Sequence, residues 1–214
     1  MIKVENIDVY GFEASIRGMR NPMNSWKVSD SKFDVYLAKD SYSPSTHYDV
    51  LIGPKDLDLM KRLFKAGTEH RKYLRMINVT MDITCSLYWW KEFDTYKIGT
   101  ACNSCSTMHK IHSKEFTIDD FSHEQLDYTS KCMLKDIISV LNKNRELFIE
   151  TKDKQYWWNM IQLLPSSYNQ KRTVQLSYET VFNIIKQREH HKLDEWIKFT
   201  DILKDLPYVR ELLQ

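Results

Sequence analysis

The chain contains 214 residues, 42% of them hydrophobic, with only five glycines and five prolines. This composition excludes a disordered or loop-rich chain, and the length suffices for a hydrophobic core without covalent cross-links. Thirty-one Lys and Arg residues against 29 Asp and Glu residues give a net charge of +2. Because the chain is close to neutral, we expect no nucleic acid polymer as a partner, and an anionic ligand would need a local cluster of cations.

The sequence predicts neither a signal peptide nor a membrane span. The segment Met1–Asn6 alternates like a strand and lacks the apolar run of a signal peptide. No stretch approaches the roughly 18 uninterrupted apolar residues that a membrane span needs. Four cysteines are too few for a disulfide framework and suit a reducing compartment. We therefore predict a cytoplasmic protein with no membrane partner, folded as one α+β domain over residues 1–214 because we find no repeat or linker.

The first fifty residues predict strands and loops. Ile2–Met19 is interpreted as a pair of strands, with Gly11 and Gly18 as the turn residues. Residues 21–46 are rich in Ser, Asp, Asn and Pro and are expected to be loop, apart from a short strand over Phe33–Leu37.

A helix and a long strand follow. The helix begins at Pro54 and ends near Gly67, because proline suits a first helical turn and glycine suits a left-handed C-cap. In the strand, Ile77–Leu87, six apolar residues alternate with polar ones, so one face of the strand is expected to be buried. This is the strongest strand signal in the chain.

The second half of the chain is predicted to be mainly helical. Ser122 is a candidate N-cap for a helix whose apolar stripe extends to about Asn144. The other predicted elements are a helix over Tyr156–Leu164 stopped by Pro165, a strand over Arg172–Ser177, a helix over Glu179–Arg188, and a helix from about Leu193 that Pro207 interrupts.

Cys102, Cys105, His109 and His112 are spaced three, four and three residues apart, which would place them on one face of a helix. Cysteine and histidine are good zinc ligands, but four ligands along one helical face span about 15 Å and cannot close one tetrahedron. We therefore predict no metal site and expect a helix that packs its small residues inward, with a site built from two of the four and distant ligands as the alternative. The C-x-x-C spacing also lacks the βαβ setting of a redox motif.

Two tryptophan pairs, Trp89-Trp90 and Trp157-Trp158, could stack on a planar ring. We favour a structural interpretation, in which one member of each pair fills the core and its neighbour covers the surface. No G-x-G-x-x-G, P-loop, H-E-x-x-H or G-x-S-x-G motif occurs, so Rossmann, P-loop, zincin and serine hydrolase functions lack their primary support.

Two parts of the chain carry a longer pattern. In the first, a helix ending in glycine leads through Glu69-His70 into the long strand and then into residues 96–109. In the second, Leu164-Pro165 precedes a strand and a helix with the pattern N-x-x-x-x-R, at Asn183 and Arg188. Over more than half of the chain, this order resembles the flavin-dependent thymidylate synthases, the ThyX family. The resemblance implies a single ThyX-like domain with a mixed sheet and a long central strand packed by several helices.

The family signature, R-H-R-x-x-S-x-N-E-x-S-x-R-Y, falls on the first of these parts, where Asn103 and Ser106 match it. The resemblance implies that Arg188 and Ser106 are the catalytic residues and contact a pyrimidine nucleotide, which Arg188 would polarise for attack. It also implies that Asn183 and Asn103 lie beside the flavin, with Lys97 as a further cofactor-binding residue.

Several cations of the family pattern are missing from this chain. A guanidinium binds phosphate through a charge-assisted, bidentate fork, which a methionine cannot replace. The family's basic positions are occupied here by Tyr96, Ile98, Met108 and Ile161, and its signature Glu and Tyr by Ser104 and His109. Lys97, Lys171 and Arg172 are candidates to bind a phosphate instead.

Two functions therefore stay open. The resemblance implies an enzyme of nucleotide biosynthesis, a methyltransferase that uses FAD, NADPH and methylenetetrahydrofolate and assembles as a homotetramer. The missing arginines favour the alternative, a catalytically inactive ThyX-like scaffold that binds a nucleotide or a protein partner. A structural protein unrelated to this family is a third alternative.

Overall fold

The structure of the protein is a computed structural model that describes residues 1–37 and 46–214, without the side chains of residues 34–37 and 46–49. The strands in these ranges are β1 (Ile2–Tyr10), β2 (Lys32–Leu37), β3 (Thr46–Leu51), β4 (Asn78–Ser86), β5 (Thr100–Ser104) and β6 (Asn169–Ser177). The α-helices are α1 (Phe12–Arg20), α2 (Pro54–Lys65), α3 (Leu87–Phe93), α4 (Thr107–Lys110), α5 (Tyr128–Thr151), α6 (Lys154–Leu163), α7 (Tyr178–Arg188), α8 (Asp194–Lys204) and α9 (Val209–Leu213). The short 3-10 helices are η1 (Asn21–Met23), η2 (Trp26–Val28), η3 (Lys72–Arg75) and η4 (Ile118–Asp120).

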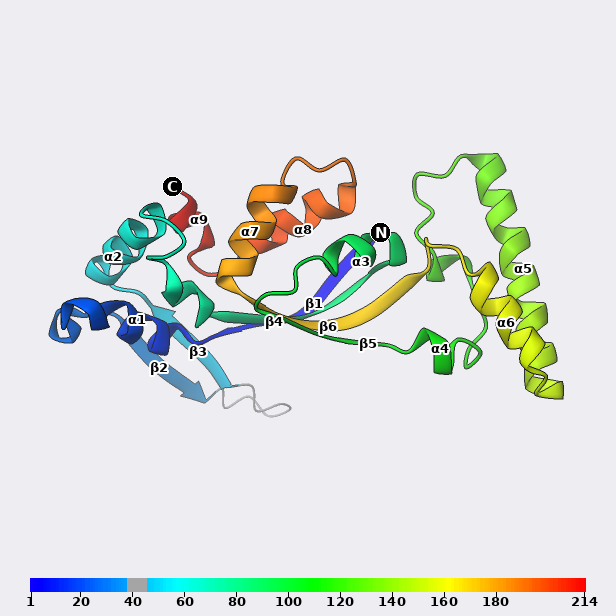
Figure 1. The fold of residues 1–214 in the computed structure, drawn as a ribbon, viewed down its shortest axis with the longest axis horizontal. Helices are drawn as coiled ribbons and strands as arrows, with labels where there is room; N and C mark the ends of the chain where they lie inside the picture. The colour runs from blue at the N-terminus through cyan, green and yellow to red at the C-terminus, as the bar shows by residue number, and fades with distance from the viewer. Residues whose placement is uncertain (38–45) are drawn as a thin grey trace. The chain divides into compact units, whose positions relative to one another are not determined.

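The main sheet has the strand order β1-β4-β6-β5, so that β4 is an interior strand (Figure 1). A separate antiparallel hairpin joins β2 to β3, with Lys32 opposite Leu51. The mixture of helices and sheet confirms the predicted α+β class. The long strand is also confirmed to within one residue at each end, and Val79, Met81 and Ile83 are buried on one face, as the alternation predicted.

The chain divides into two compact units. Unit 1 consists of Met1–Asn6, Met81–Lys97 and Cys102–Val174, and unit 2 consists of Ile7–Thr80, Ile98–Ala101 and Gln175–Gln214. The single domain over residues 1–214 stays a prediction. Within the described ranges, the helices are too short or too polar for a bilayer span.

The predicted strand pair over Ile2–Met19 is wrong in its second half, which is helix α1. Phe12, Ile16 and Met19 are buried at helical spacing on one face. Gly11 has φ +96° and precedes the helix, and a Cβ at this position would lie 2.1 Å from the carbonyl oxygen of Met76. The glycine thus permits a close backbone approach at a strand-to-helix junction, whereas we predicted a hairpin turn.

Other N-terminal predictions agree better with the structure. The strand over Phe33–Leu37 is confirmed by β2, and the loop predicted over residues 21–46 also contains η1 and η2. Residues 38–45 of that predicted loop lie outside the described residues. The helix from Pro54 is confirmed, with Pro54 in its first turn and Gly67 at φ +117° just after its C-cap.

The start and end of the longest helix were both predicted wrongly. Its N-cap is Asp127, whose side chain accepts a hydrogen bond from the backbone N–H of Ser130 at 2.7 Å. Ser122 lies five residues before this N-cap and instead donates its hydroxyl hydrogen to Oδ1 of Asn169 at 2.8 Å. The helix continues to Thr151, where Lys152 in the left-handed conformation ends it.

The remaining C-terminal elements lie close to their predicted positions. Helix α6 begins two residues early and β6 three residues early, and α7 matches within one residue. Helix α8 follows Leu193, and Pro207 separates it from α9, as predicted.

The segment from Cys102 to His112 does not form the predicted helix. Cys102 lies on β5 and Cys105 just after it, and both are exposed, so they do not pack inward. The tryptophan prediction is also wrong for Trp89 and Trp90, which are both fully buried. The other pair agrees better with the prediction. Trp157 is partly buried and packs against a hydrophobic cluster of α5 and α6, whereas Trp158 is exposed.

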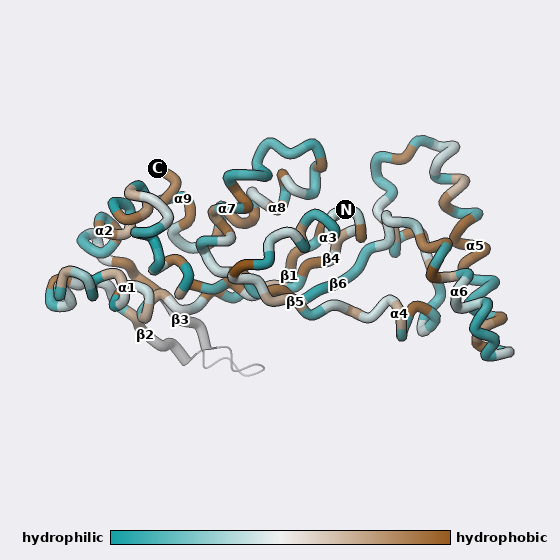
Figure 2. The backbone as a smooth tube through the Cα atoms, in the orientation of Figure 1, coloured by the Kyte–Doolittle hydropathy of each residue, from teal (hydrophilic) through white to brown (hydrophobic). Residues whose placement is uncertain are grey.

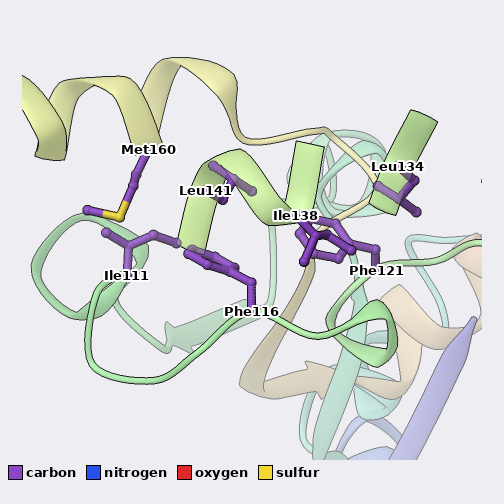
Figure 3. Close-up of a cluster of buried hydrophobic side chains, with 7 residues drawn as sticks. All are labelled: Ile111, Phe116, Phe121, Leu134, Ile138, Leu141 and Met160. Carbon is purple, nitrogen blue, oxygen red and sulfur yellow. The ribbon is translucent and has the colours of Figure 1, made fainter. Parts of the chain in front are cut away.

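One hydrophobic cluster of unit 1 lies between two helices and the segment 111–121. Figure 3 shows its side chains pointing toward one another from α5, α6 and this segment. Its members are Ile111, Phe116, Phe121, Leu134, Ile138, Leu141 and Met160. Figure 2 shows hydrophobic and hydrophilic residues interspersed along α5 and α6, as expected for helices with one buried face.

Candidate functional site

Among the described residues, a cavity in each unit is lined by a residue of the predicted site. The cavity of unit 2 has a volume of about 570 Å³ and lies at the first turns of α7. Its lining residues come from the loop before β4, from residues 98–101, from the end of β6 and from α7, and they include Asn183. Most of these side chains are amides or hydroxyls, so the cavity can exchange hydrogen bonds with a polar ligand.

Residues 98–101 lie within the predicted signature, and Ile98 and Gly99 are hydrogen-bonded to the start of α7. The Thr180 hydroxyl donates to the carbonyl oxygen of Ile98 at 2.8 Å, and the backbone N–H of Ser177 donates to that of Gly99 at 2.9 Å. Gly99 has φ +69°, and a Cβ at this position would lie 2.7 Å from Oγ of Ser177. Only glycine permits this approach, which sets one wall of the cavity.

Two charged residues line the unit 2 cavity, Glu179 and Arg75, and only Glu179 has an ion-pair partner among the described residues. Glu179 is buried and forms an ion pair with Arg71, with Nη2 of Arg71 3.0 Å from Oε1 of Glu179. The guanidinium of Arg71 also lies 5.0 Å from the centroid of the Phe64 ring. A second cation, Arg75, is exposed and lines the cavity. Arg75 makes no ion pair or side-chain hydrogen bond with the residues that the structure describes.

Three amides line the same cavity. Gln175 donates from Nε2 to Oδ1 of Asn78 at 3.2 Å, and Asn78 donates from Nδ2 to the carbonyl oxygen of Met76. The amide of Asn183 has no hydrogen-bond partner among residues 1–37 and 46–214 and is only half-buried. It can therefore both donate to and accept from a bound ligand.

The cavity of unit 1 has a volume of about 500 Å³ and contains Ser106. Its apolar wall is the hydrophobic cluster, represented by Ile111 and Phe116, together with Tyr168. The hydroxyl oxygen of Ser106 accepts a hydrogen bond from the backbone N–H of His109 at 3.1 Å and caps α4. The hydroxyl hydrogen stays available to donate to a ligand.

Three lysines line the unit 1 cavity, and two of them are paired. Lys114 forms a short ion pair with Asp120, and Nζ of Lys171 lies 3.1 Å from Oδ2 of Asp82. Lys110 is exposed and forms no ion pair within the described residues. It is therefore the lysine that can bind an anion without first breaking a pair.

Asp82 pairs with Lys171, which lines this cavity. Hydrogen bonds from Thr173 and Asn6, followed by the one from Lys171, lower the pKa of Asp82 to about 2. The Thr173 hydroxyl donates to Oδ1 at 2.6 Å and Nδ2 of Asn6 donates to Oδ2 at 2.9 Å. Asp82 is thus ionised at neutral pH and fixes the position of Lys171 at the cavity.

The structure brings only some of the predicted site residues to cavities. Asn183 lines the cavity of unit 2 and Ser106 that of unit 1. Arg188 lines neither, and its guanidinium lies 4.8 Å from the centroid of the buried Trp196 ring. Asn103 and Lys97 are exposed and also line neither cavity.

Sequence reasoning missed Arg75 and Lys110. Arg75 ends the basic run that begins at His70, three residues before β4, and this position was the available signal. Lys110 follows the signature segment by one residue. Of the suggested replacement cations, Lys171 lines a cavity, whereas Arg172 pairs with Asp94 at 2.7 Å.

Comparisons with known proteins place the fold. No protein-family model and no curated protein matches the sequence. Among solved structures, a Helicobacter pylori ThyX with FAD and dUMP covers 100% of both chains with a TM-score of 0.69 and 16% identity. A second structure of flavin-dependent thymidylate synthase ThyX from the same organism, complexed with FAD and dUMP, covers 96% of this chain and 97% of its own, with a TM-score of 0.66 and 16% identity. The fold is that of ThyX.

This likeness confirms the resemblance at the level of the fold, in which the long strand β4 lies inside the main sheet. Identity of 16% carries no residue roles from ThyX to this chain. The roles of Asn183, Ser106, Arg188, Asn103 and Lys97 accordingly stay predictions.

Proposed function

We propose that this protein is a divergent, flavin-dependent thymidylate-synthase-like protein that binds a pyrimidine deoxynucleotide. The observation that carries the proposal is the likeness of the fold over the full length of the chain to ThyX structures described with FAD and dUMP. The amide of Asn183 lines a polar cavity and has no hydrogen-bond partner within the described residues. This supports the proposal, because the family pattern places that Asn beside the flavin.

The residues present fit a flavin in unit 2 and a nucleotide in unit 1. In unit 2, Asn183 and Gln175 offer amides to the polar edge of a flavin ring. In unit 1, Ser106 offers its hydroxyl hydrogen and Lys110 offers a charge to a nucleotide phosphate. FAD would supply hydride transfer, with NADPH as reductant and methylenetetrahydrofolate as one-carbon donor, while the protein orients the reactants.

Arg188, Asn103 and Lys97 line neither cavity. In this proposal they contact the nucleotide or the flavin only when the ligand is bound or a further subunit is present. The family resemblance predicts a homotetramer, in which residues of several chains would build each site. A light-scattering mass of four chains is the expected result, and a monomer that still binds FAD would remove that part of the proposal.

A second function, a nucleotide-binding scaffold without methyl transfer, is favoured by two observations. Ile98 and Met108 stand where the family signature has arginines. Arg188 already stacks on Trp196, so using it on a nucleotide would cost that contact.

One set of measurements on the purified full chain tests both functions. We expect flavin absorbance in the isolated protein or after FAD is added, and dUMP binding that Ser106→Ala weakens by about tenfold. Formation of dTMP from dUMP with FAD, NADPH and methylenetetrahydrofolate would identify the protein as an enzyme. Binding of FAD or dUMP without turnover would identify it as a scaffold. A protein that gains neither flavin absorbance nor dUMP binding would contradict the proposal.

A further inference from the structure

We propose that Arg75 is the phosphate-binding residue of the unit 2 cavity and that this cavity takes a planar amide-bearing ring joined to a phosphate. This inference rests on the proposed function, in which the ring is that of a flavin. It adds a residue that the family resemblance did not suggest, on the 3-10 helix η3 directly before β4.

The charge balance of the cavity is the first argument. Glu179 is neutralised by Arg71 at 3.0 Å, and the pair is mostly buried. Arg75 lines the same cavity without an ion-pair partner among the described residues. The cavity therefore presents one unbalanced positive charge, carried by a guanidinium that can bind phosphate with two parallel hydrogen bonds.

The distribution of polar groups is the second argument. The cavity offers the amides of Asn183, Gln175 and Asn78, which can donate and accept along the edge of an imide or amide ring. The Thr180 hydroxyl already donates to the carbonyl oxygen of Ile98, and the Ser177 hydroxyl already bonds to Thr180. A volume of about 570 Å³ suits a ligand of mononucleotide or flavin size.

The buried Arg71–Glu179 pair explains why Arg75, and not Arg71, is the residue available to a ligand. Nε of Arg71 and Oε2 of Glu179 are buried without hydrogen-bond partners in the described part of the chain. Removing either partner would leave a buried, uncompensated charge, so the pair is expected to stay intact when a ligand binds. Arg75 is exposed and can turn toward an anion without this cost.

The test uses FMN and riboflavin, which differ by one phosphate, on the full-length chain. Arg75→Gln should weaken FMN binding at least about tenfold and leave riboflavin binding unchanged. Arg75→Lys should bind FMN with intermediate affinity, because it retains the charge but loses the fork. The dependence of FMN affinity on salt should also be weaker in Arg75→Gln than in the wild type.

Lys72→Gln is the matched control, because Lys72 is exposed on the same 3-10 helix, does not line the cavity and forms no ion pair with the described part of the chain. It should leave the affinities for both flavins unchanged. Equal losses in Lys72→Gln and Arg75→Gln would overturn the inference, because they would reveal a diffuse charge effect. So would an equal loss of riboflavin and FMN binding in Arg75→Gln.

A ring-free probe separates this inference from the proposed function. If the wild type binds neither flavin, the flavin function fails, and inorganic pyrophosphate then tests the anion site alone. Pyrophosphate binding that Arg75→Gln removes and Lys72→Gln retains supports the phosphate site for another nucleotide, and dUMP is the ligand to examine next. Wild-type protein that binds no pyrophosphate, or binding that does not depend on Arg75, would reject the site itself.

Discussion

The guanidinium of Arg188 lies 4.8 Å from the centroid of the Trp196 ring, which is fully buried on α8. This contact connects the last turn of α7 to the first turn of α8 within unit 2. The residue predicted to polarise a nucleotide is therefore also part of the packing between two helices.

Arg188→Ala tests which role dominates. Loss of the cation–π contact should lower the free energy of unfolding by about 0.5–2 kcal/mol, because Arg188 is partly desolvated. If Arg188 also contacts a nucleotide, dUMP affinity should fall in the same variant under conditions in which it is fully folded. Urea denaturation and dUMP titration measure the two effects.

Trp196→Phe is the companion variant, since it keeps an aromatic face with a weaker cation–π interaction. It should reduce stability while dUMP affinity stays within about twofold, because Trp196 is buried beneath the guanidinium. A loss of stability without any loss of affinity in Arg188→Ala would identify Arg188 as a packing residue only.

Asp56 is the most heavily hydrogen-bonded buried carboxylate of unit 2. Nε of Arg20 lies 2.6 Å from its Oδ1, and the hydroxyls of Ser29 and Ser31 donate to its Oδ2 at 2.7 and 2.6 Å. Asp56→Asn would leave the Arg20 charge buried without a counter-ion, and we expect a loss of about 3–5 kcal/mol in the free energy of unfolding.

Asp58→Asn is the matched control, two residues away on the same helix. Asp58 pairs with Arg62 at 2.9 Å, but both side chains are about two-thirds exposed, at 66% each. Such a pair contributes at most about 0.5 kcal/mol. Equal losses in the two variants under urea denaturation would show that the buried network does not stabilise unit 2.

The sequence predicted those parts of the fold in which one periodicity dominates. β4 alternates over its whole length, and α2 has proline at its start and glycine after its end, so both were located correctly. α1 was missed because Gly11 and Gly18 suggested turns, although the apolar residues Phe12, Ile16 and Met19 have helical spacing.

The candidate site was predicted less well, because its geometry depends on contacts between distant residues. Nothing near Ser122 in the sequence indicates that its hydroxyl bonds to Asn169 rather than to a helix terminus. The spacing of Cys102 and Cys105 suits a helix, but pairing of β5 with β6 places them on an exposed strand and the turn after it. Arg75 could be ranked above its basic neighbours only after the structure showed Arg71 paired with Glu179.

The acid titration of Asp82 follows from its hydrogen bonds. Its pKa in the folded protein is lowered to about 2, mainly by Thr173 and Asn6 and then by Lys171. A carboxylate with a lowered folded pKa stabilises the fold above its unfolded pKa of roughly 3.9. This contribution is lost as the pH falls from about 4 toward 2, so unit 1 should lose stability in that window.

Carboxyl chemical shifts in an NMR titration measure this directly. Thr173→Val and Asn6→Ala should each raise the pKa of Asp82, since each removes a donor to the charged form. Asp127 serves as the reference carboxylate, because its pKa is lowered by a separate hydrogen bond from the backbone N–H of Ser130 and should stay lowered in both variants. An Asp82 that titrates near 4 in the wild type would contradict the hydrogen-bond geometry.

Gly99→Ala tests the wall of the unit 2 cavity. At φ +69° an alanine is strained, and its Cβ would lie 2.7 Å from Oγ of Ser177 and 3.1 Å from Oγ1 of Thr180. We expect a loss of more than about 1 kcal/mol in the free energy of unfolding and weaker flavin binding, because residues 98–101 would shift away from α7.

Gly18→Ala gives the opposite expectation and controls for a general effect of removing glycine. Gly18 lies within α1, where alanine gains up to about 1 kcal/mol in helix propensity, and its nearest neighbour is the flexible end of the Met76 side chain at 3.1 Å. Gly18→Ala should therefore be neutral or stabilising and leave flavin affinity unchanged. If urea denaturation shows Gly99→Ala to be as stable as the wild type, the close approach of residues 98–99 to α7 does not set the cavity wall, and Asn183 would need another means of facing its ligand.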